Sequence, residues 1–228
     1  MSLKMNQSLS VTVDNVLFTI RDDSLHVLLV KRAKEPFAGQ WALPGGILDT
    51  DKDADGERAA SRILEEKTGL RINYLEQLRT YAGDFDPRGY TVSIAHFALT
   101  SDFALSPKVA SVEEAQWVPV KLLSDLKLAF IHRDIIEDAL NRLREKAKYS
   151  LIPLYCLPKQ FTIVGFTKVM SVILGKTIQR KTVQRRLEQV EAIVPVKGEV
   201  ATGTRGPQSQ LYTLTKPINE INFERNLN

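Results

Sequence analysis

Cysteine is almost missing from this sequence, since Cys156 is the one thiol in 228 residues. A single cysteine cannot form an internal disulfide or supply a multi-cysteine zinc site. Cys156 lies in an apolar stretch, so we expect a buried structural thiol and not a nucleophile. Long apolar runs are missing too, because no stretch approaches the roughly 18 uncharged apolar residues of a membrane-spanning helix. We therefore expect a soluble protein.

The first ten residues lack the basic start and apolar centre of a secretory signal, so we expect a cytoplasmic location. Repeats and low-complexity tracts are absent as well. With 43% hydrophobic and 25% charged residues, the composition is typical of folded domains and excludes a disordered or collagen-like chain. At roughly 100 to 200 residues per domain, the length predicts two domains.

The net charge of +4 is distributed unevenly along the chain. Eight basic and three acidic residues lie between Gly175 and Lys216, which is enough to account for the whole positive excess. An acidic run lies much earlier, from Asp49 to Glu57. The two parts of the chain are therefore expected to have different partners.

The hydrophobic pattern predicts both strands and helices in residues 1–148, which we assign to the first domain. Strands are expected at 11–20, 25–31, 74–81, 91–100 and 116–118, with a loop at 33–46. One helix follows the acidic run and ends at Gly69. An amphipathic helix comes last, with an apolar face of Ile135, Ile136, Ala139, Leu140 and Leu143. Pro153 and Pro158 break the helical period, so the domain boundary is placed near Lys148.

Residues 149–228 are assigned to a second, smaller domain. The elements expected there are helices over 163–174 and about 179–190, strands over 193–196 and 210–214, and a long hairpin loop over 197–209. Thr162 can N-cap the first helix, and Gly175 lies just past its end. Two short helices joined by a tight turn and followed by a basic hairpin resemble a winged helix-turn-helix.

The second of these helices is expected to turn Val183, Leu187 and Val190 inward. Its Arg and Gln side chains are then exposed and suited to reach guanine and adenine edges in a major groove. The hairpin is expected to lie along phosphates or in the minor groove. The residues expected to contact DNA are Arg180, Lys181, Thr182, Gln184, Arg185, Arg186, Lys197, Thr202 and Arg205. The alternative is a charged, solvated face on an accessory domain.

A loop and a helix in the first domain carry a second pattern. The loop is WALPGG at 41–46, and the helix contains RILEEKTGL at 62–70. Together they resemble the Nudix box, G-x5-E-x7-R-E-U-x-E-E-x-G-U, in which U is an aliphatic residue. In that family the helix glutamates hold divalent cations against a diphosphate linked to a nucleoside, and water cleaves the linkage.

The resemblance is incomplete at the metal-binding positions. The positions that match are Arg62, Leu64, Glu66 and Gly69. Ile63 and Lys67 occupy the other two helix glutamate positions. The spacing from Gly46 to Gly69 is two residues longer than the pattern, which places the earlier glutamate position among Lys52, Asp53 and Ala54. An alternative register keeps Glu65-Glu66 as the paired acids, but it does not restore the metal cluster either.

We therefore expect neither catalytic nor metal-binding residues in this domain, and no requirement for Mg²⁺. An ammonium at Lys67 could neutralise a diphosphate directly, with no activated water nearby, so the cleft would bind without cutting. The alternative is that Lys67 is a solvated helix residue. Ile63, next to Leu64, is most simply a core residue.

Several other residues are candidates for this cleft. Arg32 and Arg88 could contact phosphate, and Phe37 and Trp41 could stack on an adenine or else anchor the loop. His132 could contact the ligand, or it could be a surface or capping residue. The complete set of expected ligand-binding residues is Arg32, Phe37, Trp41, Gly46, Arg62, Glu66, Lys67, Arg88 and His132.

The combination of the two domains resembles the Nudix-related transcriptional regulators of bacterial NAD biosynthesis. Residues 31–46 and the Asp-Pro-Arg-Gly turn at 86–89 share in this resemblance. The resemblance implies an α+β protein, with a Nudix-like α/β/α sandwich around a mixed sheet followed by a winged helix-turn-helix. It also implies a homodimeric repressor of NAD salvage genes that leaves a palindromic double-stranded DNA operator when ADP-ribose binds. Two alternatives stay open, an active ADP-sugar hydrolase with a basic accessory domain and a regulator that senses a non-nucleotide sugar.

Overall fold

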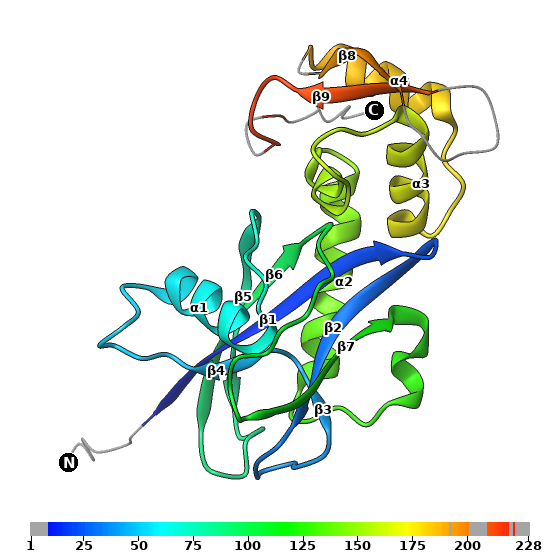
Figure 1. The fold of residues 1–228 in the computed structure, drawn as a ribbon. Helices are drawn as coiled ribbons and strands as arrows, with labels where there is room; N and C mark the ends of the chain where they lie inside the picture. Colours follow the sequence, from blue (N-terminus) through cyan, green and yellow to red (C-terminus); the bar gives the residue numbers. More distant parts are fainter. Residues whose placement is uncertain (1–8, 192, 201–208, 219–220, 222–228) are drawn as a thin grey trace, which may run out of the picture. The chain divides into compact units, whose positions relative to one another are not determined.

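Two long strands, β1 (Ser10–Arg21) and β2 (Ser24–Arg32), form a hairpin at the centre of the N-terminal sheet (Figure 1). The turn residues Asp22 and Asp23 have φ of 47° and 59°, as a two-residue type I′ turn requires. The two strands expected at 11–20 and 25–31 are therefore confirmed, and a tight turn joins them. The computed structural model describes residues 9–191, 193–200, 209–218 and 221.

Five further strands complete this sheet, namely β3 (Trp41–Ala42), β4 (Gly45–Ile47), β5 (Leu75–Gly83), β6 (Thr91–Leu99) and β7 (Val112–Pro119). The strand order is β3, β2, β1, β6, β5. In addition, β4 pairs with β1 and β7 pairs with β2. The prediction of a continuous loop over 33–46 is wrong, because β3 and the start of β4 lie within it. Strands of two or three residues are too short for an alternating pattern, and long-range pairing creates them.

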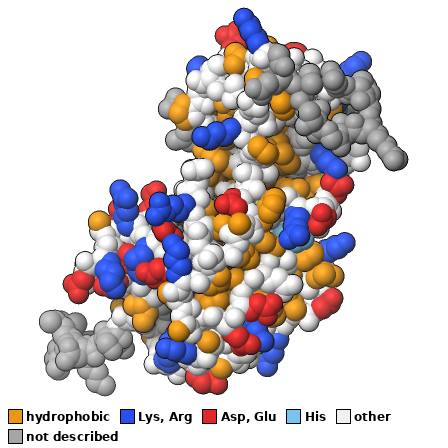
Figure 2. Space-filling view, in the orientation of Figure 1, with side chains coloured by type: hydrophobic (Ala, Val, Ile, Leu, Met, Phe, Trp, Pro, Cys, Tyr) orange, Lys and Arg blue, Asp and Glu red, His pale blue; other side chains and the backbone are white. Residues whose placement is uncertain are grey.

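Helix α1 (Gly56–Thr68) covers one face of the sheet. The Asp55 carboxylate caps it by accepting the backbone N–H of Arg58, and Gly69 ends it with a left-handed φ of 81°. Its buried side chains, which include Ala60 and Ile63, pack against Val13 of β1. The predicted helix and its glycine stop are confirmed. On its outer side, basic and acidic side chains lie interspersed (Figure 2).

Helix α2 (His132–Ala147) lies on the opposite face and follows the 3-10 helix η1 (Val120–Asp125). Successive side chains of a strand point to opposite faces, and β1 shows this directly. Asn15 reaches α1, where its Nδ2 donates to the Ala60 carbonyl, whereas the preceding Asp14 faces His132 of α2. A sheet with a helix on each face is the predicted three-layer sandwich.

The C-terminal part contains η2 (Ile152–Cys156), α3 (Ile163–Leu174), α4 (Arg180–Gln189) and the paired strands β8 (Ile193–Val200) and β9 (Gln210–Leu214). Thr162 caps α3 by accepting the backbone N–H of Gly165, and Gly175 ends it in the left-handed region. Helix α3 packs against α4 and η2, and Phe161 exchanges backbone hydrogen bonds with Tyr212 of β9. This arrangement is the predicted winged helix-turn-helix.

Cys156 is 5% exposed, and burial raises the pKa of its thiol to about 12. The prediction of a buried thiol is confirmed.

The chain folds as two units. The larger contains β1 as far as Phe18, then His26–Ala98 and Asp102–Ala139. The smaller contains the β1–β2 turn at Thr19–Leu25, the short segment Leu99–Ser101 and the chain from Leu140 onward. The boundary near Lys148 stays a prediction. Among the residues that the structure describes, no helix is long and apolar enough to cross a membrane.

Candidate functional site

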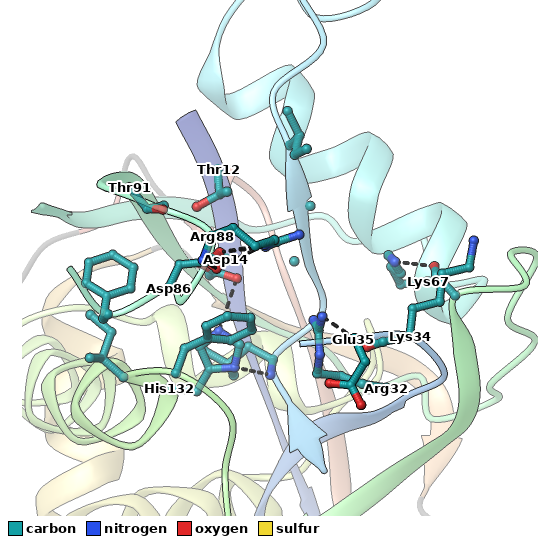
Figure 3. Close-up of a pocket in the computed structure, with 18 residues that line it drawn as sticks. Thr12, Asp14, Arg32, Lys34, Glu35, Lys67, Asp86, Arg88, Thr91 and His132 are labelled. Carbon is teal, nitrogen blue, oxygen red and sulfur yellow. Dashed lines mark hydrogen bonds and ion pairs between the residues drawn. The ribbon is translucent and has the colours of Figure 1, made fainter. Parts of the chain in front are cut away.

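A cavity of about 320 Å³ opens in the larger unit, with walls from β1, β4, α1, the 84–91 turn and the start of α2 (Figure 3). Five of the nine predicted ligand-binding residues line it. They are Arg32, Gly46, Lys67, Arg88 and His132. The lining also contains polar residues that the sequence did not indicate, namely Thr12, Asp14, Lys34, Glu35, Asp86, Thr91 and Ser111.

One end of the cavity is cationic, because Arg32, Lys34 and Lys67 meet there (Figure 3). Arg32 Nε donates to the Pro36 carbonyl at 2.8 Å, and its guanidinium lies 4.9 Å from the centre of the Phe130 ring. Lys67 Nζ donates to the Ser111 hydroxyl. Within the described part of the chain, no carboxylate forms an ion pair with any of these three cations.

Burial, and then the nearby charge of Arg32, lower the pKa of Lys67. Burial, and then the charge of Arg88, likewise lower the pKa of Arg32. Both shifts reflect partly desolvated positive charges with other cations nearby, so an anion bound beside them would be stabilised. Lys67 is half-buried in the cavity wall and is therefore not a fully exposed helix residue, while its contact with a ligand stays a prediction.

The other end of the cavity holds Asp14 and His132. The Asp14 carboxylate accepts a hydrogen bond from Ser93 Oγ at 2.6 Å and lies 3.4 Å from His132 Nε2. His132 is 4% exposed, and its Nδ1 accepts the backbone N–H of Leu43 at 2.9 Å, which places the ring proton on Nε2 facing Asp14. The alternative of a surface or capping histidine is therefore wrong.

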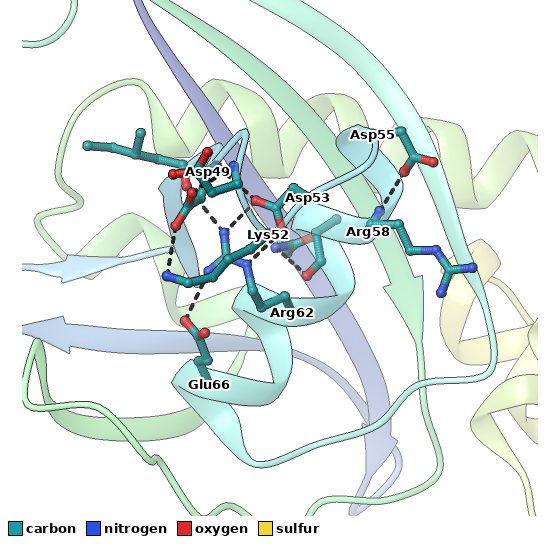
Figure 4. Close-up of polar contacts among 11 residues, drawn as sticks. Asp49, Lys52, Asp53, Asp55, Arg58, Arg62 and Glu66 are labelled. Atoms are coloured by element: carbon teal, nitrogen blue, oxygen red, sulfur yellow. Dashed lines mark hydrogen bonds and ion pairs between the residues drawn. The ribbon is translucent and has the colours of Figure 1, made fainter.

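The box arginine forms a closed ion-pair network instead of contributing to the cavity (Figure 4). Arg62 Nε and Nη2 donate to both Asp53 oxygens at 2.7 and 2.6 Å, and its Nη1 donates to Glu66 at 3.1 Å. Of the three candidates for the earlier acidic position, Asp53 is the one that pairs with Arg62. Neither Arg62 nor Glu66 lines the cavity.

Three other carboxylates near the box are also occupied. Asp49 pairs with Lys52, Asp55 caps α1, and Glu65 pairs with Arg71 and Lys108. Ile63 is 1% exposed in the core, as predicted. In the described ranges no group of three or more His, Cys, Asp or Glu side chains could hold a metal ion. The donor set of this box therefore does not fit the divalent cations that the Nudix pattern implies.

The Asp53–Arg62 pair gives a stability prediction, since the Asp53 side chain is only 1% exposed. We expect Asp53→Asn to lower the free energy of unfolding by about 2 kcal/mol at pH 7, because it removes the charge of the buried partner and leaves Arg62 with only its ion pair to Glu66. The hydrogen bond from Arg62 lowers the pKa of Asp53, so its contribution is complete above pH 3.8 and is lost as the pH falls through the folded-state pKa.

Chemical denaturation of both proteins across this pH range would measure the difference, which should shrink towards acidic pH. Asp49→Asn is the matched control, because its partner Lys52 is exposed and the expected loss is below about 1 kcal/mol. Equal losses in the two variants would contradict a special role for the Asp53 pair.

The two predicted stacking aromatics lie outside the cavity. Phe37 packs edge-on against Phe130, with ring centres 4.9 Å apart. Trp41 pairs with Lys31 in the sheet, and its carbonyl accepts the backbone N–H of Ala129. The Phe37 ring therefore anchors the loop, which is the alternative that the sequence left open, whereas the contacts named for Trp41 are those of its backbone and the role of its ring stays a prediction.

The exposed face of α4 carries Arg180, Lys181, Thr182 and Arg185, opposite the buried Val183 and Leu187. Gln184 is half-buried, and its Nε2 donates to Glu188 at 3.0 Å. Arg186 differs from its predicted neighbours, because its Nη1 donates to the Lys148 carbonyl at 3.0 Å. Lys197 is exposed on β8, while Thr202 and Arg205 lie outside the described residues.

Comparison with known proteins agrees with both halves of this description. The model of the NUDIX domain matches residues 11–139, and the model of the NrtR DNA-binding winged helix domain matches residues 153–214. The chain is 32% identical over 218 residues to the ADPR responsive transcriptional repressor NtrR of Acinetobacter baylyi, covering 95% of this chain and 86% of the relative. The chain belongs to the NrtR family of Nudix-related regulators.

Solved structures of the NrtR family superpose closely on this chain. Shewanella oneidensis NrtR complexed with a 27mer DNA gives a TM-score of 0.86 at 41% identity, covering 96% of this chain and 99% of that one. The NUDIX domain of the same protein, complexed with ADP ribose, gives a TM-score of 0.59 at 40% identity over 63% of this chain and 94% of that one. An ADP-ribose pyrophosphatase of Methanocaldococcus jannaschii is 34% identical over 131 residues, which are 57% of this chain and 72% of the relative.

Proposed function

We propose that this protein is a transcriptional repressor whose cavity binds ADP-ribose without cleaving it, and whose winged helix then leaves its DNA operator. The observation that carries this proposal is Lys67, a cation in the cavity wall at a position where the Nudix pattern has a metal-binding glutamate. Arg32 and Lys34 lie at the same end. These three cations, which form no ion pair with a carboxylate among the described residues, supply directly the charge that divalent metals supply in a hydrolase.

Binding without cleavage follows from the same residues. Hydrolysis of a diphosphate in this fold requires a metal-activated water, and carboxylates must hold the metal. Here Glu66 and Asp53 are engaged with Arg62, and Glu65 is engaged with Lys108 and Arg71. We therefore propose that binding needs no Mg²⁺ and that the protein is not an enzyme.

The DNA partner is proposed from α4 and the β8–β9 hairpin. The exposed Arg180, Lys181 and Arg185 are suited to phosphates and to guanine edges in a major groove. A single winged helix contacts only a few base pairs, so we propose a homodimer on a palindromic operator. The proposed targets are genes of NAD biosynthesis or salvage, and the proposed location of the protein is the cytoplasm.

A DNA-release experiment tests this function. Fluorescence anisotropy of a labelled palindromic operator should fall when ADP-ribose is added to the complex, and EDTA should not change the midpoint, because no metal takes part. Adding ribose or arabinose instead tests the alternative of a non-nucleotide sugar sensor. Release by a free sugar but not by ADP-ribose would contradict the proposed effector.

A further inference from the structure

The cavity has two chemically different ends (Figure 3). Arg32, Lys34 and Lys67 lie at one end, while Asp14 and the Asp86–Arg88 pair lie towards the other. A bound diphosphate explains why cations line one end of the cavity, but it does not explain why carboxylates line the other. Negative carboxylates inside an anion-binding cavity oppose that ligand, so they require a separate explanation.

Of the two carboxylates at the second end, Asp14 has the free acceptor capacity. Both Asp86 oxygens already accept hydrogen bonds from Arg88 Nε and Nη2, at 2.5 to 3.2 Å. Asp14 accepts one hydrogen bond from Ser93 and faces one N–H of His132. An ionised carboxylate has about four acceptor positions, so Asp14 can accept further donors.

Asp14 stays ionised although it is buried. Burial by itself would raise its pKa, but the facing His132 imidazole and the hydrogen bonds from His132 and Ser93 outweigh burial and lower the pKa below its usual value. An ionised carboxylate accepts hydrogen bonds and donates none. Its partner in the cavity must therefore carry N–H or O–H groups.

The backbone around Asp14 is shaped to hold the carboxylate in place. Gly45 of β4 pairs with Asp14, and a Cβ at Gly45 would lie 2.0 Å from Asp14 Oδ1. Any side chain at position 45 would collide with the carboxylate. The neighbouring strand thus leaves room for the Asp14 carboxylate at the cavity wall.

We infer that Asp14 determines specificity for a sugar in the ligand, by accepting hydrogen bonds from its hydroxyl groups. This inference rests on the proposed function, in which the diphosphate occupies the cationic end. A sugar hydroxyl is uncharged and donates to Asp14, whereas a phosphate at this position is negatively charged and is repelled. The site therefore selects a diphosphate that carries a sugar over a bare diphosphate.

Calorimetric titration of Asp14→Asn with two probes, ADP-ribose and inorganic pyrophosphate, tests the inference. We expect the variant to bind ADP-ribose about 10-fold more weakly or worse, because a hydrogen bond to a charged acceptor is lost. Pyrophosphate should bind equally well or more tightly, because a repelling charge is removed. Retained pyrophosphate binding also shows that the variant is folded.

Glu35→Gln is the matched control, since it makes the same chemical change at the cationic end of the cavity. It should change the affinities for both probes in the same direction. Ser93→Ala is the second variant if Asp14→Asn does not fold. It keeps the charge but removes the hydrogen bond that fixes Asp14, so it should weaken ADP-ribose binding selectively.

Equal weakening of both probes by Asp14→Asn would overturn the inference, because Asp14 would then only support the fold. Unchanged or tighter ADP-ribose binding would overturn it as well, because no hydroxyl contact would have been lost. Absence of ADP-ribose binding in the wild-type protein is a different result, which would overturn the proposed effector itself.

Discussion

The double variant Arg180→Ala/Arg185→Ala should bind its operator at least about 30-fold more weakly than the wild-type protein. Both side chains are exposed on α4, and each arginine that contacts a base contributes about 1 to 3 kcal/mol. Where they contact phosphates instead, the salt dependence of binding should become less steep by about one counterion per contact. Anisotropy titrations at several salt concentrations would measure both quantities.

Arg58→Ala is the matched control, because Arg58 is exposed on α1 in the other unit and its removal changes the net charge by one. Operator binding by this variant should differ little from wild type. Affinity for ADP-ribose should stay unchanged in the α4 variants. Arg205→Ala should also weaken operator binding, by about 5-fold or more for a single arginine. Unchanged operator affinity in both the α4 double variant and Arg205→Ala would contradict the winged-helix interface.

Lys67→Glu should reduce affinity for ADP-ribose on the order of 100-fold in the absence of metal. The substitution replaces a half-buried cation by an anion beside the proposed diphosphate, and changes of this kind at buried charges cost about 2 to 5 kcal/mol. It also restores one glutamate of the Nudix pattern next to Glu66. Millimolar Mg²⁺ should therefore recover part of the lost affinity, which calorimetric titration with and without Mg²⁺ would measure.

Lys67→Met serves as the control, since it removes the charge but keeps the length of the side chain. It should weaken binding by about 10-fold and show no response to Mg²⁺, because a thioether is a poor ligand for a hard cation. If Lys67→Glu neither weakens binding nor becomes metal-dependent, Lys67 does not face the diphosphate.

The parts of the fold that local chemistry determines could be predicted from the sequence. Thr162 and Gly175 delimit α3, and Gly69 ends α1, because capping and left-handed φ depend on residues within a few positions. The apolar, β-branched runs of β1 and β2, with a turn-like segment at 21–24 between them, likewise specified a hairpin. The short β3 and β4 could not be predicted, since partners distant in the sequence create them.

In the candidate site too, features set by nearby residues could be predicted, whereas features set by distant residues could not. Lys67 followed from the spacing of the box, and Arg32 and Arg88 followed from their turns. Asp14 was missed, although a lone aspartate inside the apolar run of β1 was a usable indication of function. The surroundings of His132 could not be predicted, because Leu43 and Asp14, each more than 80 residues away, supply its contacts.

Arg186 and Phe37 show a further limit of sequence reasoning. Each is of a suitable residue type in a suitable segment, yet Arg186 binds the Lys148 carbonyl and Phe37 packs on Phe130. Residue type and position in the sequence indicate which side chains lie near a site, but the packing of the folded chain decides which of them face it.

The central claim, a Nudix cavity that binds ADP-ribose without cleaving it, is tested most directly by phosphorus NMR. ADP-ribose is mixed with stoichiometric protein and excess Mg²⁺, and spectra are followed for several hours. We predict that the diphosphate resonances shift or broaden while no phosphomonoester resonance appears. Growing monophosphate resonances would contradict the claim, because they would show an active hydrolase in spite of the missing glutamates.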